Sequence, residues 1–254
     1  MTITLLPDTA FAFMMIFARM GAVIMLLPAI GDRAVPANIR LVFALSITLL
    51  FYPIVQPLLP SMPTTIAGMV MALLLELLIG LFLGLVLRMI TVALTVAGTT
   101  IAFQMGLGFA LSADPTQNGG QGAVIGTFLS LLGITLILVA DLHHPFIVAL
   151  HDSYLLFKPG EVVSVGDAVQ AGLTMFAGAF RLGIQMSAPF IAFGLLFYLG
   201  LGILSRLMPQ MQIFFIAMPL NILLGFIMLA ILLVALMSWY LDHVGRAIQP
   251  FLAG

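Results

Sequence analysis

Apolar runs as long as membrane spans follow one another along most of this chain, with short polar breaks between them. A helix needs about 20 apolar residues to cross the hydrocarbon core of a bilayer. The runs cover residues 10–27, 41–59, 66–87, 89–105, 123–140, 168–204 and 211–241. They predict an all-α, polytopic integral membrane protein with six to seven hydrophobic helical segments.

The third and fourth runs are separated by a single charged side chain. Residues 66–105 are interrupted only by Glu76 and Arg88. A continuous helix over this stretch would be about 60 Å long, which is more than one perpendicular crossing needs. We therefore expect this stretch either to break or to leave the bilayer.

Proline, glycine and arginine mark the boundaries of the runs. Four prolines, at 53, 57, 60 and 63, end the second run, and residues 114–122 form a loop rich in Gly, Asp and Asn. Arg33, Arg40, Arg88 and Arg246 favour an external N-terminus and an internal C-terminus, although Arg206 falls on the opposite side. The N-terminus lacks a basic segment before its apolar run, so we expect that run to be retained. Without a repeat or soluble linker, residues 1–254 are predicted to form a single domain.

Composition excludes several classes of protein. Only 7% of the residues are charged and 63% are hydrophobic, so the chain lacks the polar coat of a soluble domain. Its eight Lys and Arg residues are scattered, which indicates no nucleic-acid partner and no polybasic lipid-binding patch. The absence of cysteine excludes disulfides and thiolate metal sites. No cofactor is expected.

Four ionisable side chains lie inside the apolar runs: Arg19, Glu76, Arg88 and Arg181. Each would cost about 2.5–3.5 kcal/mol at the centre of a membrane helix, so each should face protein or water. One hypothesis is a proton or ion relay. The other is helix pairing, snorkelling at the edge of a span, or contact with another subunit. The second is favoured, because a relay usually needs several acids at membrane depth and Glu76 is alone.

The densest polar cluster contains Asp141, His143, His144, His151 and Asp152. Its spacing allows a metal site, but Pro145 is expected to interrupt the helical face, so the cluster is interpreted as an interfacial helix end with solvated histidines and no metal. His151, Asp152 and Ser153 contain the residue types of a catalytic triad. Adjacent residues on a helix point about 100° apart, however, and should not form a relay. No phosphate-binding loop or other catalytic motif is present, so the chain is not expected to be an enzyme.

Two glycine-containing segments suggest particular contacts. Gly80 and Gly84 form a GxxxG face that allows another helix to approach closely. In the segment 105–115, Gly106 and Gly108 bracket Leu107 and precede Phe109, ahead of a polar loop. A bulky apolar side chain on a pliable backbone suits a hydrophobic constriction that excludes water. A helix C-cap with a buried Phe explains the same pattern, and both possibilities stay open.

Five stretches together resemble the FliR family of flagellar export proteins, whose relatives serve injectisomes. The stretches are FARMGAV at 17–23, the Leu27–Ala44 region with Pro28, Gly31, Pro36 and Arg40, GLGFALSADPTQ at 106–117, Phe128–Leu131 followed by DLHH at 141–144, and Pro209–Leu220. Their order and spacing cover essentially the whole chain. The chain departs from the family pattern at Gln212 and Asn221.

The resemblance implies a non-catalytic subunit of the type III export gate, in the bacterial inner membrane at the flagellar basal body. Its implied partners are FliP and FliQ in a helical ring, the neighbours FlhB and FlhA, unfolded export substrates and membrane lipid. Leu107, Phe109 and Ala110 would form a plug in the closed pore, with Gly106 and Gly108 as its hinges. The helices would pack as hairpins against sister subunits, and these neighbouring chains would satisfy the buried arginines. The alternatives are an injectisome gate subunit, an independent secondary transporter and an intramembrane enzyme.

Overall fold

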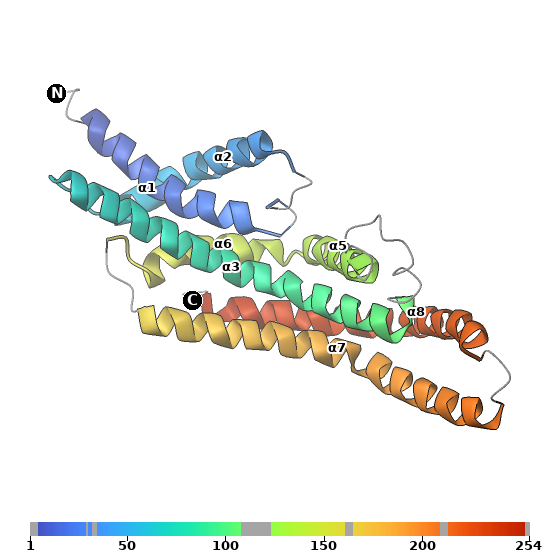
Figure 1. Ribbon diagram of the computed structural model, residues 1–254. Coiled ribbons are helices and arrows are strands. Elements are labelled where there is room, and N and C mark those ends of the chain that lie inside the picture. The colour runs from blue at the N-terminus through green and yellow to red at the C-terminus, as the bar shows by residue number, and fades with distance from the viewer. Residues whose placement is uncertain are drawn as a thin grey trace. The chain divides into compact units, whose positions relative to one another are not determined.

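A computed structural model describes residues 5–28, 30–31, 35–107, 123–160, 165–208 and 213–251. This part of the chain is helical and contains no strand, which confirms the all-α prediction (Figure 1). The longer helices are α1 (Leu5–Leu26), α2 (Ala37–Val55), α3 (Ile66–Gln104), α5 (Ala123–Val139), α6 (His143–Leu156), α7 (Val165–Leu207) and α8 (Ile213–Ile248). Two short 3₁₀ turns, η1 (Gln56–Leu58) and η2 (Gln249–Phe251), follow α2 and α8.

Five of these helices are long and apolar enough to cross a membrane: α1, α2, α3, α7 and α8. The pair α5 and α6 passes the same test only as one broken span, which raises the number to six. The runs 66–87 and 89–105 form one continuous helix of 39 residues, so the two predicted segments are a single element. This merger explains why the structure agrees with the lower of the two predicted numbers.

Helix α6 corrects one expectation about the histidine cluster. Pro145 does not interrupt a helical face, because it lies in the first turn of α6. The first four backbone N–H groups of a helix have no partner within it, so a proline is tolerated there. The break that separates α5 from α6 contains Asp141, whose φ of 57° ends the preceding helix.

The chain divides into two compact units that interleave along the sequence. The first contains residues 1–90, 137–176 and 244–254, and the second contains 91–136 and 177–243. The single domain expected from the sequence stays a prediction. In the first unit, apolar side chains of α1, α2 and α6 form a buried cluster of Ile16, Met20, Phe51, Val55 and Tyr154. A second buried cluster in this unit contains Phe11, Met15 and Ala72.

Glycines set the closest helix contacts in both units. In the first, a Cβ added to Gly80 would collide with the backbone oxygen of Arg19, and one on Gly84 would lie 2.8 Å from the Leu26 side chain. The predicted GxxxG face is therefore confirmed as a contact surface, and its partner is α1. In the second unit, a Cβ on Gly98 would overlap the backbone of Gly126, so α3 and α5 meet there through their main chains.

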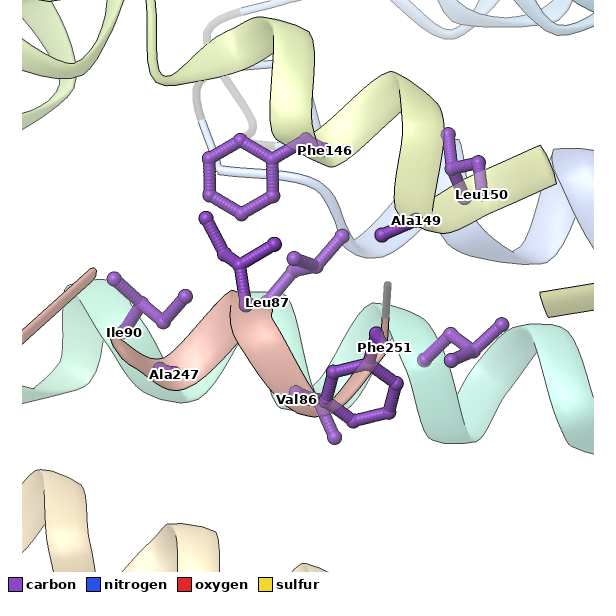
Figure 2. A pocket seen from close by; sticks show the side chains of 10 residues that line it. Val86, Leu87, Ile90, Phe146, Ala149, Leu150, Ala247 and Phe251 are labelled. Carbon is purple, nitrogen blue, oxygen red and sulfur yellow. The ribbon is translucent and has the colours of Figure 1, made fainter. Parts of the chain in front are cut away.

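The first unit also contains an apolar pocket between α3, α6 and the end of α8. Leu83, Val86, Leu87 and Ile90 line it from α3, and Phe146, Ala149 and Leu150 from α6. Ala247, Ile248 and Phe251 complete the lining, and Figure 2 shows the Phe146 and Phe251 rings among these side chains. No polar side chain lines this pocket, so it contributes packing and holds no candidate chemistry.

Candidate functional site

The first unit contains a buried ion pair between Arg19 of α1 and Glu76 of α3. Arg19 Nε donates to Glu76 Oε2 at 2.6 Å, and Nη2 donates to Oε1 at 3.0 Å. Both side chains are fully buried. Arg19 lies on the same face of α1 as Met15 and Val23, which are also fully buried, since residues three or four apart share one side of a helix. The helical pattern therefore directs this arginine into the core.

The carboxyl end of α6 provides the remaining contacts of the guanidinium. Nη1 donates to the backbone oxygen of Ser153 at 2.9 Å and to its hydroxyl at 3.3 Å. Nη2 also donates to the backbone oxygen of Phe157 at 3.0 Å, and the Arg19 Cζ lies 4.0 Å from the centroid of the Tyr154 ring. All five N–H groups of Arg19 thus have acceptors. A cation is also stabilised at the negative end of a helix dipole.

This arrangement favours helix pairing over a proton relay. Both Glu76 oxygens accept hydrogen bonds from Arg19, and no donor of the guanidinium is left over. The partners of Arg19 lie within this chain, so the expectation that neighbouring chains would satisfy it is wrong. What the site does physically is join three helices, α1, α3 and α6, at one point.

Arg88 and Arg181, the two other arginines that the sequence places inside the apolar runs, are in different surroundings. Arg88 is partly exposed on α3, and Arg181 is exposed on α7. Sequence reasoning treated all four ionisable residues alike. It also missed Ser153, Tyr154 and Phe157 as partners of Arg19, because the contact to α6 joins residues 134 positions apart.

The polar cluster around α6 separates into two groups. Ligand atoms of Asp141, His143 and His144 lie within 4.8 Å of one another, while His151 and Asp152 lie farther along α6. The Asp141 and His144 side chains are 76% and 66% exposed, as expected for a solvated helix end. We assign no metal to this group, because two of its three members, Asp141 and His144, are exposed side chains at the break between α5 and α6.

The pair His151 and Asp152 corrects the argument about adjacent residues. His151 Nδ1 lies 2.9 Å from Asp152 Oδ1, so neighbouring side chains do meet here. They form no triad, since the Ser153 hydroxyl donates instead to the backbone oxygen of Leu150 at 2.7 Å.

The carboxyl end of α3 leads into the predicted plug. Gly106 is buried with a φ of +77°, a conformation that favours glycine, and its N–H donates to the Phe103 oxygen at 3.0 Å. Leu107 is partly exposed. Gly108, Phe109 and Ala110 lie outside the described residues, so their predicted roles stay predictions.

Asn221 of α8 is a second buried polar contact that sequence reasoning missed. Its Nδ2 donates to the backbone oxygen of Gln104 at 3.1 Å, and the residue is 2% exposed. It could have been found as an amide inside the apolar run 211–241, had uncharged polar groups been searched as well as charged ones.

Comparison with known proteins decides the family. The family model described as "Bacterial export proteins, family 1" matches residues 10–247. Relatives named flagellar biosynthetic protein FliR match over nearly the same length. The chain belongs to the FliR family. It is similar to FliR of Caulobacter vibrioides, with 43% identity over 93% of this chain and 94% of the relative.

More distant FliR proteins match as well. The Bacillus subtilis protein is 34% identical over 87% of this chain and 85% of its own length. The Escherichia coli protein is 29% identical over 92% of this chain and 88% of its own. Membership of the FliR family places this chain in flagellar biosynthesis and protein export, and its long apolar helices indicate a membrane protein.

Proposed function

We propose that this chain is a structural, pore-forming subunit of the flagellar type III export gate in the bacterial inner membrane. It assembles with FliP and FliQ, next to FlhB and FlhA, around a channel for unfolded flagellar proteins. The observation that carries the proposal is the length over which the long helices expose apolar side chains. The names of the relatives favour a flagellum over an injectisome.

Helix α7 exposes large apolar side chains along almost its whole length. Val169 near its start is 55% exposed, and Leu207 at its end is 73% exposed. These positions are about 57 Å apart along the axis, whereas the hydrocarbon core is about 30 Å thick. This apolar length is about twice the length that one membrane crossing needs, so a single crossing in lipid would not cover it.

Helix α3 presents the same excess length. Ile66 in its first turn is 79% exposed, and Phe103 in its last turn is 62% exposed. Lipid cannot cover both ends, and water would not solvate them, so other protein surfaces are the remaining cover. Sister subunits with similar apolar helices supply that cover and support a gate that rises partly above the lipid plane.

Arg181 adds a polar argument for sister subunits. It is exposed in the middle of α7, where contact with hydrocarbon would cost about 2.5–3.5 kcal/mol. A facing chain or a water-filled space removes that cost. This exposed arginine is therefore a proposed contact between subunits.

The channel is proposed to be closed by Leu107, Phe109 and Ala110, with Gly106 and Gly108 as hinges. The positive φ of Gly106 supports a turn of the backbone at the base of this segment. A ring of apolar side chains in a narrow pore excludes water and ions. Leakage should therefore be suppressed while no substrate is present.

Co-purification tests the assembly. A tagged chain extracted in mild detergent should retain FliP and FliQ, and the untagged strain provides the background control. If the solitary chain in liposomes instead moves a solute without FliP or FliQ, a secondary transporter would replace the gate as the better explanation.

Ion leak tests the plug. Replacing Leu107, Phe109 and Ala110 by glycine should raise ion leak through the assembled gate, measured in membrane vesicles that contain FliP and FliQ. A matched replacement of three exposed residues of α2, Ile39, Val42 and Leu49, by alanine controls for general disturbance of the membrane. Equal leak in the plug variant and the wild type would contradict the plug assignment.

A further inference from the structure

The second unit fixes the carboxyl end of α3 with a buried amide from α8. We propose that Asn221 is a positioning residue that anchors this end of α3 and, through it, the base of the plug segment. The link to the plug rests on the function proposed above. The anchoring of α3 can be tested without it.

The amide of Asn221 binds a backbone group that the helix leaves unpaired. The last four carbonyl groups of a helix lack partners within it, and Gln104 is the last residue of α3. Asn221 Nδ2 donates to the Gln104 oxygen at 3.1 Å. A Cβ on Gly106 would lie 3.1 Å from the same nitrogen, so the amide also lies directly against the turn.

Two glycines hold the neighbouring side chains of α3 in place. Gly225 lies one helical turn after Asn221, on the same face of α8, and a Cβ there would collide with the fully buried Met105 side chain. On α7, a Cβ on Gly194 would collide with the Gln104 side chain. Gln104 and Met105, the last residue of α3 and the one after it, therefore pack against glycines of α7 and α8, and Asn221 adds a hydrogen bond to the Gln104 oxygen.

A small cavity lies beside this turn. It is lined by Gly106 and Asn221 together with apolar side chains of α7 and α8, among them Phe197 and Leu201. Packing is therefore incomplete on that side of Gly106. The hydrogen bond from Asn221 thus contributes more to holding the turn than it would in a fully packed site. The Asn221 Oδ1 is buried and accepts no hydrogen bond from the described residues, which costs free energy. An apolar residue of similar size would fill the site without this cost. Packing alone therefore does not account for asparagine at this position.

Backbone exchange and ion leak together test the proposal in the assembled gate. Asn221→Leu keeps the approximate volume but removes the donor, and loss of one net hydrogen bond should raise the population of the released turn by about fivefold to tenfold. We expect hydrogen exchange at residues 104–107 and ion leak to rise by that factor. Ser238→Ala, which removes a hydroxyl exposed on α8, should change neither.

Two further variants separate anchoring from a general structural effect. Asn221→Gln retains a donor and should restore part of the protection from exchange. Gly225→Ala displaces Met105 and should loosen the same end of α3 while Asn221 is intact. In a chain whose Leu107, Phe109 and Ala110 are replaced by glycine, adding Asn221→Leu should cause no further leak, because an anchor acts only through the segment it holds.

The outcomes distinguish this proposal from the function on which it depends. Unchanged exchange at 104–107 in Asn221→Leu would overturn the anchor, whatever the plug does, and a rise in Gly225→Ala would show that the measurement detects loosening of this end. Leak in the plug variant without leak in Asn221→Leu would overturn the link between them and leave the gate intact. Increased exchange with no leak in either variant would support the anchor and contradict the plug.

Discussion

Helix α3 has a buried polar contact near each end, and the two contacts are built in opposite ways. Near its start, Glu76 pairs with an arginine whose five donors all have acceptors, on α3 and at the carboxyl end of α6. Near its end, the Gln104 oxygen accepts one neutral hydrogen bond from Asn221, beside a small cavity. One contact is charged and completely enclosed, and the other is neutral and incompletely packed.

The difference predicts which of the two contacts opens more readily. Breaking a buried ion pair costs about 3–5 kcal/mol, whereas one neutral hydrogen bond contributes about 0.5–1.5 kcal/mol net. We therefore expect the Gln104 contact to open more readily than the Glu76 contact. A subunit that supplies both a fixed wall and a movable stopper would need this division.

Removing one member of the ion pair should give the largest effect. Arg19→Leu leaves Glu76 buried without its partner and the end of α6 without its cation, so we expect a loss of about 3–5 kcal/mol in the free energy of unfolding. Thermal unfolding in detergent measures this loss. Lys158→Ala, at an exposed position just after α6, should leave the midpoint unchanged. Equal midpoints for the two variants would show that the pair does not hold the first unit together.

The double variant Arg19→Leu with Glu76→Leu sharpens this result. Replacing a buried ion pair by apolar residues is often nearly neutral, because both desolvation costs disappear together. The double variant should recover only part of the stability that Arg19→Leu loses, since the Phe157 oxygen also loses its donor. Full recovery would indicate that the contacts to α6 contribute nothing, and no recovery would indicate that they dominate. The same unfolding measurement distinguishes these cases.

Crowding the close contact between α1 and α3 should give the next largest loss in the free energy of unfolding. Gly80→Ala forces a methyl group against the backbone of Arg19, and overpacking of this kind costs about 1–3 kcal/mol. Gly178→Ala is the matched control within α7, because no atom lies within 4 Å of the added Cβ. There the higher helix propensity of alanine should stabilise the chain by up to about 1 kcal/mol. Midpoints that shift in opposite directions would confirm the difference.

A smaller loss is expected just after the carboxyl end of α3, at Gly106. Gly106→Ala places a side chain at a φ of +77°, which costs about 1–2 kcal/mol for a residue other than glycine. Asparagine tolerates this conformation better, so Gly106→Asn should lose less. Unfolding midpoints of the two variants measure the order. Equal losses would point to crowding against Asn221 as the cause in place of backbone strain.

The sequence predicted the class of fold because apolar run length is a local property. It also identified Arg19, Glu76 and the close approach at Gly80 and Gly84. It did not predict that Arg19 and Glu76 are partners, since the pairing depends on how α1 and α3 pack. Nor did it show that the runs 66–87 and 89–105 are one helix, because one charged residue between them, Arg88, is compatible with either a break or a continuous helix.

The contacts to α6 and α8 were beyond sequence reasoning for another reason. Backbone oxygens at the ends of helices, such as those of Phe157 and Gln104, have no sequence signature. Their partners become visible only when helix ends are placed in space. Gly106, by contrast, does have a sequence signal, because a backbone turn with a positive φ favours glycine.

Arg181 should give the smallest effect on stability and still matter for assembly. Its exposed side chain predicts a change within about 0.5 kcal/mol for Arg181→Ala in the isolated chain, in contrast to the large loss for Arg19. If a sister subunit covers Arg181, the same variant should retain less FliP and FliQ in mild detergent. Normal stability together with reduced co-purification would assign one buried arginine to the fold and one exposed arginine to the assembly. Normal recovery of both partners would place Arg181 at a water-filled surface, because exposure to lipid would destabilise the wild type at this position.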